Sequence, residues 1–187
     1  MKRFIVIAGV NGAGKSTFYS SEPPFGDIPI LNLDEIVRNN GDWRNPVNVV
    51  TSGRIMLRQI EKNFKNGSSF GQETTLCGKN IINEIKKAKS FGYSVFLYYV
   101  GLDNSEIAKE RVHYRVNHGG HGIPDEDIER RYYESFSNLK TVLPLCDLAV
   151  FYDNTYRFRR FAFFKNGLCV RLSSEVPQWY REFFDNN

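Results

Sequence analysis

The segment 9–16, which reads GVNGAGKS, constrains this chain more than any other stretch of its sequence. It has the pattern G-x-x-x-x-G-K-S, it follows the apolar run at 4–8, and it leads into a predicted helix, which is the context that the pattern requires. Glycines allow the backbone to wrap closely around an anion with its N–H groups pointing inward. A loop that only turns the chain is the alternative, but eight positions and both flanks agree with phosphate binding. The segment therefore predicts a nucleoside triphosphate site.

The parts of this loop have separate predicted roles. Lys15 is expected to reach the β- and γ-phosphates of ATP, and the Ser16 hydroxyl is expected to bind Mg²⁺. The helix that follows adds the positive end of its dipole. The predicted ATP-binding residues of the loop are Gly9, Asn11, Gly12, Ala13, Gly14, Lys15, Ser16 and Thr17.

Length and composition limit the number of domains and the class of partner. The 187 residues suffice for one well-buried domain, so we expect a single domain over 1–187. Hydrophobic residues make up 41% of the chain, which predicts a globular protein, and a net charge of +4 is too mild for a nucleic-acid-binding domain. Three widely spaced cysteines predict reduced thiols in the cytoplasm. The N-terminal apolar run is too short for a signal peptide or a membrane span, so we expect no membrane partner.

Apolar runs alternate with segments of helical periodicity along the chain. Strands are predicted at 4–8, 28–33, 69–74, 93–100 and 147–152, and helices are predicted at 15–20, 46–66, 79–91 and 125–142. A further helix is expected to begin with a capping box at Asp103 and Glu106 and to end near Asn117. The expected fold is therefore α/β, a three-layer P-loop NTPase fold of the nucleotide-kinase type with a five-stranded parallel sheet.

Two further expectations concern the ends of these elements. The helix at 46–66 should turn one apolar face inward, made of Val47, Val50, Leu57, Ile60 and Phe64. Beyond the fifth strand, residues 159–165 and 168–172 predict a small C-terminal β-hairpin, and a short helix carrying Trp179 completes an addition at about 156–187.

Asp34 follows the second predicted strand and lies 19 positions after Lys15. An acid near the γ-phosphate can accept the proton of an attacking hydroxyl, which favours a kinase. The sequence around Asp34 and Glu35 also resembles the acidic pair of an ATPase motor, but its position on the second strand is too early for that class. Alternatively Asp34 caps the helix that follows, a role that is compatible with the first. Glu73 is expected at the same edge of the sheet, at the end of the third strand.

Four arginines surround a glycine-rich segment at 117–124. Arg111 and Arg115 are four residues apart and share a helix face, and Arg130 and Arg131 follow the segment. Phosphoryl transfer needs positive charge that closes over the γ-phosphate and excludes water, so the region at about 111–131 is predicted to be a lid. The alternative is a set of surface arginines that pair with Glu110, Glu129 or Glu134.

Two weaker signals have simpler interpretations. His113, His118 and His121 lack carboxylate or cysteine partners at zinc spacing and are interpreted as lid residues, with His121 near phosphate. The alternating arginines and phenylalanines at 157–164 are similar to an RNA-binding strand but lack its glycines, which favours an amphipathic hairpin at the sheet edge.

Several motifs in a fixed order resemble the zeta-toxin-like P-loop kinases, over roughly residues 3–155. They are GVNGAGKST, LNLDE, QETTL at 72–76, the R-V-x-x-R-V-x-x-G-G-H-x-I-P segment, R-Y-x-x-S-x-x-N-L at 131–139 and D-L-A-x-x-Y-D-N. The glycine–histidine segment with its flanking arginines is the most specific of these.

This resemblance implies residue roles, an activity and a partner. Asp34 matches the catalytic acid, Glu73 with Thr74 matches the substrate-positioning segment, and Asn154 lies where related kinases hold adenine. Arg131 and either Arg111 or Arg115 match the pair that clamps phosphate. The expected catalytic residues are Lys15, Asp34, Arg115 and Arg131, and the expected substrate-binding residues are Glu73, Thr74, Arg111 and His121. The family's typical members phosphorylate UDP-N-acetylglucosamine and are restrained by a small helical antitoxin.

Two functions follow from the sequence and stay open at this point. One is an ATP- and Mg²⁺-dependent kinase that phosphorylates a hydroxyl of a small molecule. The other is a nucleotide-binding switch ATPase without an acceptor. The acids at 34 and 73 and the arginine lid favour the kinase.

Overall fold

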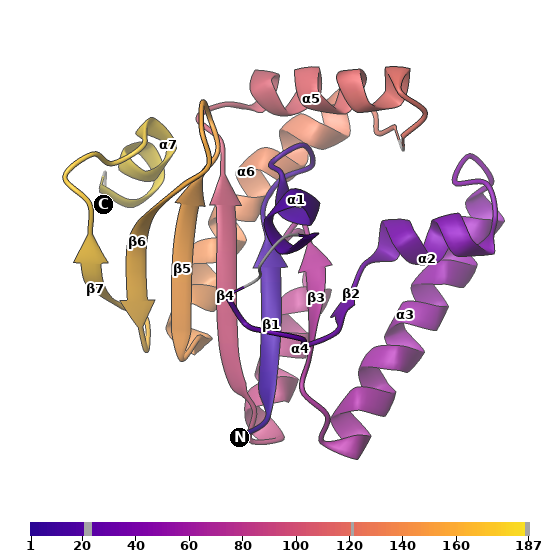
Figure 1. Ribbon diagram of the computed structural model, residues 1–187, viewed down its shortest axis with the longest axis horizontal. Helices are drawn as coiled ribbons and strands as arrows, with labels where there is room; N and C mark the ends of the chain where they lie inside the picture. Colours follow the sequence, from indigo (N-terminus) through magenta and orange to yellow (C-terminus); the bar gives the residue numbers. More distant parts are fainter. Residues whose placement is uncertain (21–23, 121, 186–187) are drawn as a thin grey trace.

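The computed structural model describes residues 1–20, 24–120 and 122–185. Its centre is one mixed sheet of seven strands in the order β2-β3-β1-β4-β5-β6-β7 (Figure 1). The strands are β1 (Arg3–Ala8), β2 (Ile30–Leu31), β3 (Phe70–Thr74), β4 (Ser94–Gly101), β5 (Leu148–Asp153), β6 (Arg159–Lys165) and β7 (Leu168–Leu172). The pairs from β2 to β5 are parallel, and β6 and β7 continue the sheet antiparallel. The expected parallel sheet is thus part of a larger mixed sheet that includes the hairpin.

The helices connect these strands and cover the sheet. They are α1 (Lys15–Ser20), α2 (Leu33–Asn40), α3 (Pro46–Asn66), α4 (Asn80–Ser90), α5 (Ser105–Asn117), α6 (Asp125–Val142) and α7 (Gln178–Tyr180). A 3-10 turn (Leu143–Leu145) follows α6, and a π-helical turn (Arg181–Asp185) follows α7. The helix bounds predicted at 46–66 and 125–142 and both hairpin strands are confirmed.

The hydrophobic core is larger on one face of the sheet than on the other. The larger cluster joins residues of the sheet to α3, α4 and α6, for example Phe64, Ile85 and Phe136. The opposite face has a smaller cluster, in which Phe18 of α1 packs near Tyr98. In Figure 1 α1 lies in front of the sheet, and the phosphate loop and α5 lie at the edge where the parallel strands end. This edge is where ligands of open parallel sheets bind.

The predicted second strand was too long, and the helix after it begins early. Only Ile30–Leu31 pairs with β3, because the Asn32 side chain caps α2 by accepting from the backbone N–H groups of Asp34 at 2.8 Å and Glu35 at 3.3 Å. Asp34 therefore lies in the first turn of α2, and the interpretation of Asp34 as the cap was wrong. Asparagine is as good an N-cap as aspartate, so the sequence allowed either residue.

Two other expectations need correction. The cap of α5 is Asn104, whose Oδ1 accepts from Ile107 N at 3.0 Å, and not Asp103. On α3, Ile60 and Phe64 are buried as predicted, but Val47, Val50 and Leu57 are at least half exposed. The N-terminal half of α3 has α2 as its neighbour and extends beyond the sheet (Figure 1), so its apolar face has no sheet to cover.

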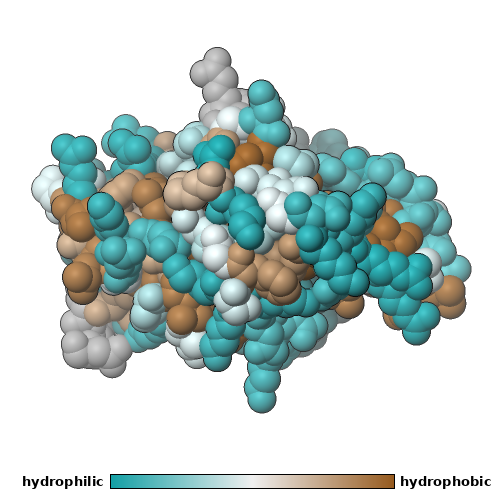
Figure 2. Space-filling model, turned by 90° about the horizontal axis from the view of Figure 1, so that it is seen from below, coloured by the Kyte–Doolittle hydropathy of each residue, from teal (hydrophilic) through white to brown (hydrophobic). Residues whose placement is uncertain are grey.

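The surface away from the site is mixed in character. Seen from below, hydrophilic side chains spread over this end of the molecule with hydrophobic ones scattered among them (Figure 2). Within the described residues, no helix combines the length and the apolar character that crossing a membrane requires.

The C-terminal segment is fixed to the sheet by one tryptophan. Trp179 is fully buried, and its ring lies so close to Gly101 that a Cβ on that glycine would come within 2.3 Å of it. The Trp179 backbone N–H donates to Asp103 Oδ1 at 3.1 Å, and its indole N–H donates to Asp153 Oδ1 at 3.4 Å. The end of the chain therefore holds together the turns that follow β4 and β5.

Trp179→Ala should lower the free energy of unfolding by about 3–5 kcal/mol, because it leaves a large cavity and removes a donor from buried Asp153. Urea unfolding followed by circular dichroism measures this change. Tyr156→Ala, at a side chain that is 92% exposed, is the control and should change stability by less than about 0.5 kcal/mol. A similar small loss for Trp179→Ala would contradict the role given to the C-terminal segment.

Candidate active site

The phosphate loop packs through close backbone approaches that only glycine permits. Gly12 has φ +78°, and a Cβ there would lie 2.7 Å from the carbonyl oxygen of Ala108 in α5. Gly14 has φ +93°, and its Cβ would lie 2.6 Å from Nδ2 of Asn154, which also donates to Ala13 O at 2.9 Å. The loop borders a hollow of about 220 Å³, which is lined by loop residues and by side chains of α2, β3 and α5. Such a glycine-lined hollow fits a phosphate chain that contacts backbone N–H groups.

Lys15 begins α1 and points back over the loop. Its ammonium group donates to Val10 O at 3.1 Å and pairs with Glu73 Oε1 at 3.6 Å, and the residue is only 6% exposed. Burial lowers the pKa of Lys15, while the charges of Glu73 and Asp34 oppose this shift. An ammonium held by one carbonyl and one carboxylate can exchange these partners for phosphate oxygens.

Glu73, at the end of β3, accepts hydrogen bonds from two residues of α1 and from the residue before α2. Its Oε2 accepts from Ser16 Oγ at 2.9 Å, from Tyr19 OH at 3.0 Å and from Asn32 Nδ2 at 2.9 Å. Burial raises the pKa of Tyr19, and the charge of Glu73 adds to the shift, so this hydroxyl remains a donor. The structure thus places Glu73 against the hydroxyl expected to bind Mg²⁺ and also on the wall of a cavity of about 600 Å³.

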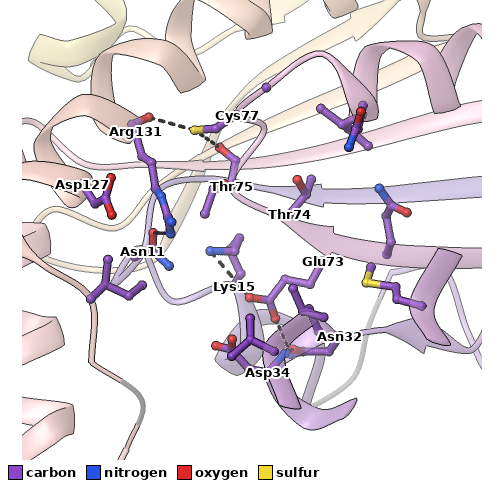
Figure 3. A pocket seen from close by; sticks show the side chains of 18 of the residues that line it. Asn11, Lys15, Asn32, Asp34, Glu73, Thr74, Thr75, Cys77, Asp127 and Arg131 are labelled. Carbon is purple, nitrogen blue, oxygen red and sulfur yellow. Dashed lines mark hydrogen bonds and ion pairs between the residues drawn. The ribbon is translucent and has the colours of Figure 1, made fainter. Parts of the chain in front are cut away.

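Asp34 lies where three cavities meet. It lines the phosphate-loop hollow, a cavity of about 600 Å³ between β3 and α6, and a third of about 580 Å³ between α2 and α5. In Figure 3 Arg131 and Asn11 lie on one side of Lys15, and Glu73 and Asp34 lie on the other. A carboxylate at this junction is in reach of both a phosphate chain and a second molecule.

The four arginines separate into different environments. Arg131 Nη1 donates to Asn11 Oδ1 at 3.2 Å, and Arg111 Nη2 donates to the carbonyl oxygens of Asn154 at 2.8 Å and Thr155 at 3.1 Å. Arg111 and Arg115 both line the phosphate-loop hollow. Arg130 instead pairs with Asp127 at 2.7 Å and Glu134 at 2.9 Å on its own helix. The alternative of a surface pair applies to Arg130, while the other three reach the loop.

In the segment between α5 and α6, the backbone of Gly120 lies against the side chain of Arg115. A Cβ on Gly120 would lie 2.4 Å from Arg115 Cγ, so this position needs glycine for the arginine to lie where it does. His113 contacts Asp125 Oδ1 at 2.7 Å and His118 contacts Tyr114 O at 2.8 Å, while His121 lies outside the described residues. Among the described side chains, no three from His, Cys, Asp and Glu are grouped to hold a metal.

Thr74 shapes the turn after β3. Its Oγ1 accepts from the backbone N–H of Leu76 at 3.0 Å, and Leu76 has φ +63° although it is fully buried. A buried leucine in the left-handed region is strained, and such strain persists where the surroundings hold it. Asn138 Nδ2 does so by donating to Leu76 O at 2.8 Å. Thr74 thus lines the larger cavity and also fixes its wall.

Sequence reasoning missed four polar residues of the site. Asn32 and Tyr19 complete the hydrogen bonds of Glu73, and Asn32 donates to Tyr19 OH at 2.7 Å. Gln72 and Glu84 lie in the larger cavity and share a hydrogen bond of 2.7 Å. The cap preference of asparagine could have indicated Asn32, whereas the other three are set by tertiary packing.

Known proteins and solved structures are similar to this chain, and three of them bear on its family and fold. No protein-family model matches it. An uncharacterized protein of Haemophilus influenzae is 32% identical over 128 residues, which cover 68% of this chain and 91% of the relative. A chain of the AvrRxo1-ORF1:AvrRxo1-ORF2 complex with sulphate ions has a TM-score of 0.73 and 13% identity, and the match covers 98% of this chain. This chain spans only 63% of that neighbour. The same complex is also known with ATP, at a TM-score of 0.62.

The second solved structure comes from a toxin–antitoxin system. A chain of the PezAT chromosomal toxin–antitoxin system of Streptococcus pneumoniae has a TM-score of 0.65 and 16% identity, and the match covers 100% of this chain and 80% of that one. At these identities the structures establish the fold, and the Haemophilus protein establishes the family. This chain belongs to the family of the Haemophilus influenzae protein, and its fold is that of the zeta-toxin-like P-loop kinases.

Proposed function

We propose that the protein transfers the γ-phosphate of ATP to a hydroxyl group of a small molecule. The position of Asp34 carries this proposal, because its carboxylate lines both the phosphate-loop hollow and the 600 Å³ cavity. A general base in a kinase must reach the acceptor hydroxyl beside the γ-phosphate. Asp34 is the proposed base, and the larger cavity is the proposed acceptor site.

The residues of the loop fit a nucleotide and its metal. Gly9, Asn11, Gly12, Ala13, Gly14, Ser16 and Thr17 are proposed to bind the phosphates through their N–H groups and hydroxyls, with Lys15 neutralising their charge. Ser16 Oγ, held by Glu73 at 2.9 Å, is the proposed Mg²⁺ ligand. When bound, Mg²⁺ supplies charge stabilisation to the phosphates. The AvrRxo1 complex that contains ATP supports the choice of nucleotide.

The lid is proposed to act at the transferred phosphate. Arg115 and Arg131 are the proposed clamps, since both lie beside the loop and can strengthen their contacts as charge develops. Arg111, which the resemblance assigns to substrate binding, donates to the backbone carbonyl of Asn154, and Asn154 is proposed to contact the adenine. His121 remains a proposed phosphate contact of the lid at about 111–131.

The acceptor and the partner are drawn from the family resemblance. UDP-N-acetylglucosamine is the first acceptor to test, and Glu73 and Thr74 are proposed to bind it. A small antitoxin protein is a candidate partner, since the PezAT neighbour belongs to a toxin–antitoxin system. A switch ATPase without an acceptor remains the second candidate, because the phosphate loop alone serves both functions.

Lys15→Ala should abolish ATP turnover and leave the fold intact, because Lys15 bonds to the loop and to Glu73 and does not fill the core. ATP turnover by a coupled assay and the circular dichroism spectrum measure both properties. Lys65→Ala on α3 is the control and should turn over ATP at the wild-type rate. Wild-type turnover by a folded Lys15→Ala protein would exclude the nucleotide site.

Asp34→Asn should lower phosphate transfer by about 10²–10⁴-fold, because an amide cannot take the proton of the acceptor hydroxyl. Binding of ATP and Mg²⁺, followed as thermal stabilisation, should be kept. The stability of the free protein should also be kept, since Asn32 and not Asp34 caps α2. If transfer of labelled γ-phosphate is undiminished, Asp34 is not the base. If no acceptor exists and slow ATP hydrolysis is unchanged, the switch function replaces the kinase.

Arg131→Ala should lower kcat by about 10²–10³-fold with little change in the KM for ATP, as expected of a group that acts on the transition state. The neighbouring Arg130→Ala is a matched control, because its exposed pairs with Asp127 and Glu134 contribute about 0–1 kcal/mol to stability. Steady-state kinetics on both variants make the comparison. If the two substitutions change kcat equally, Arg131 has no more part in phosphate transfer than the surface residue Arg130.

A further inference from the structure

Glu84 of α4 is an acid in the larger cavity without an ionic partner. The cavity is lined by more carboxylates than cations. The carboxylates are Asp34, Glu73, Glu84, Asp127 and Glu134, and the cations are Lys15, Arg130 and Arg131. Glu73 pairs with Lys15, and Asp127 and Glu134 pair with Arg130. Glu84 makes no ion pair with any described residue, and Lys87, three residues further on, pairs with Glu61.

Gln72 adds a second, independent signal at the same place. It is 3% exposed, it lines the cavity, and its Nε2 donates to Glu84 Oε2 at 2.7 Å. Its Oε1 is buried and has no hydrogen-bond partner among the described residues. A buried acceptor without a donor costs free energy unless a bound molecule supplies the donor.

The Glu84 carboxylate and the amide oxygen of Gln72 both accept hydrogen bonds, and the carboxylate is also an ionic group. A ligand group that donates several hydrogen bonds, accepts none and carries positive charge satisfies both at once. A protonated amine has these properties. A diphosphate, such as that of the UDP-N-acetylglucosamine suggested by the family resemblance, would instead lie near a carboxylate that makes no ion pair, so this cavity favours a cationic acceptor over that one.

We propose that Glu84 and Gln72 form a subsite for a protonated amino group, so that the acceptor is an amino alcohol or an amino sugar whose hydroxyl lies at Asp34. This inference rests on the proposed kinase function and deepens it by giving the class of acceptor. Met56 and Ile81 line the same cavity and offer apolar contacts to the carbon skeleton of such an acceptor.

The test uses small probes and does not need the natural acceptor. Thermal unfolding of the wild type, Glu84→Gln and Glu126→Gln is measured with 2-aminoethanol, with 1,2-ethanediol, and with potassium chloride at equal ionic strength. The amine should raise the melting temperature of the wild type and of Glu126→Gln by at least about 2 °C and should leave Glu84→Gln unchanged. Glu126→Gln is a matched control, since it removes an exposed acid on α6 that does not line this cavity.

Three outcomes would overturn the subsite: no shift with the amine, the same shift in Glu84→Gln, or an equal shift with the diol. Stabilisation by ATP and Mg²⁺ is measured on the same samples. If ATP stabilises all three proteins and the amine stabilises none, only the amine subsite is lost. If ATP stabilises none of them, the proposed kinase function fails.

Discussion

The carboxylate of Glu73 is the interaction on which the rest of the site depends. It accepts hydrogen bonds from the hydroxyls of Ser16 and Tyr19 and from the amide of Asn32, and it pairs with Lys15. Two separate segments, α1 and the residue before α2, therefore have Glu73 as a common partner. Because Asn32 also caps α2, the position of Asp34 in its first turn is fixed relative to the phosphate loop.

This arrangement is better explained by function than by stability. A largely buried ion pair often contributes little to folding, because removing two charges from water offsets their attraction. Under the proposed function, the pair holds a cation and a hydroxyl in position before phosphate binds, which lowers the cost of reorganisation. The lowered pKa of Lys15, caused mainly by burial, fits a residue kept at an unfavourable position for such a task.

The sequence could predict those features that depend on local spacing. The glycine loop, the helices over 46–66 and 125–142, and the hairpin strands follow from short patterns, and the structure has them at the predicted residues. The length of β2 and the cap of α2 could not be predicted, because Asn32 and Asp34 are equally good caps and only packing against Tyr19 and Glu73 selects one. The separation of Arg130 from Arg131 likewise depends on which side chain faces Asn11 across the fold.

The pleat of β3 places two neighbouring residues of the proposed site on opposite faces of the sheet. Gln72 and Glu73 are neighbours on β3, so their side chains leave opposite faces of the sheet. Glu73 faces α1 and the phosphate loop, where its partners are Ser16 and Lys15, while Gln72 faces α4 and bonds to Glu84. Pairing of β3 with β1 fixes this register, with Val6 opposite Gln72 and Ile7 opposite Glu73. Because a slip of one residue would exchange the two faces, the order of these two residues and the register of β3 together decide which side chain faces the phosphate loop and which faces α4.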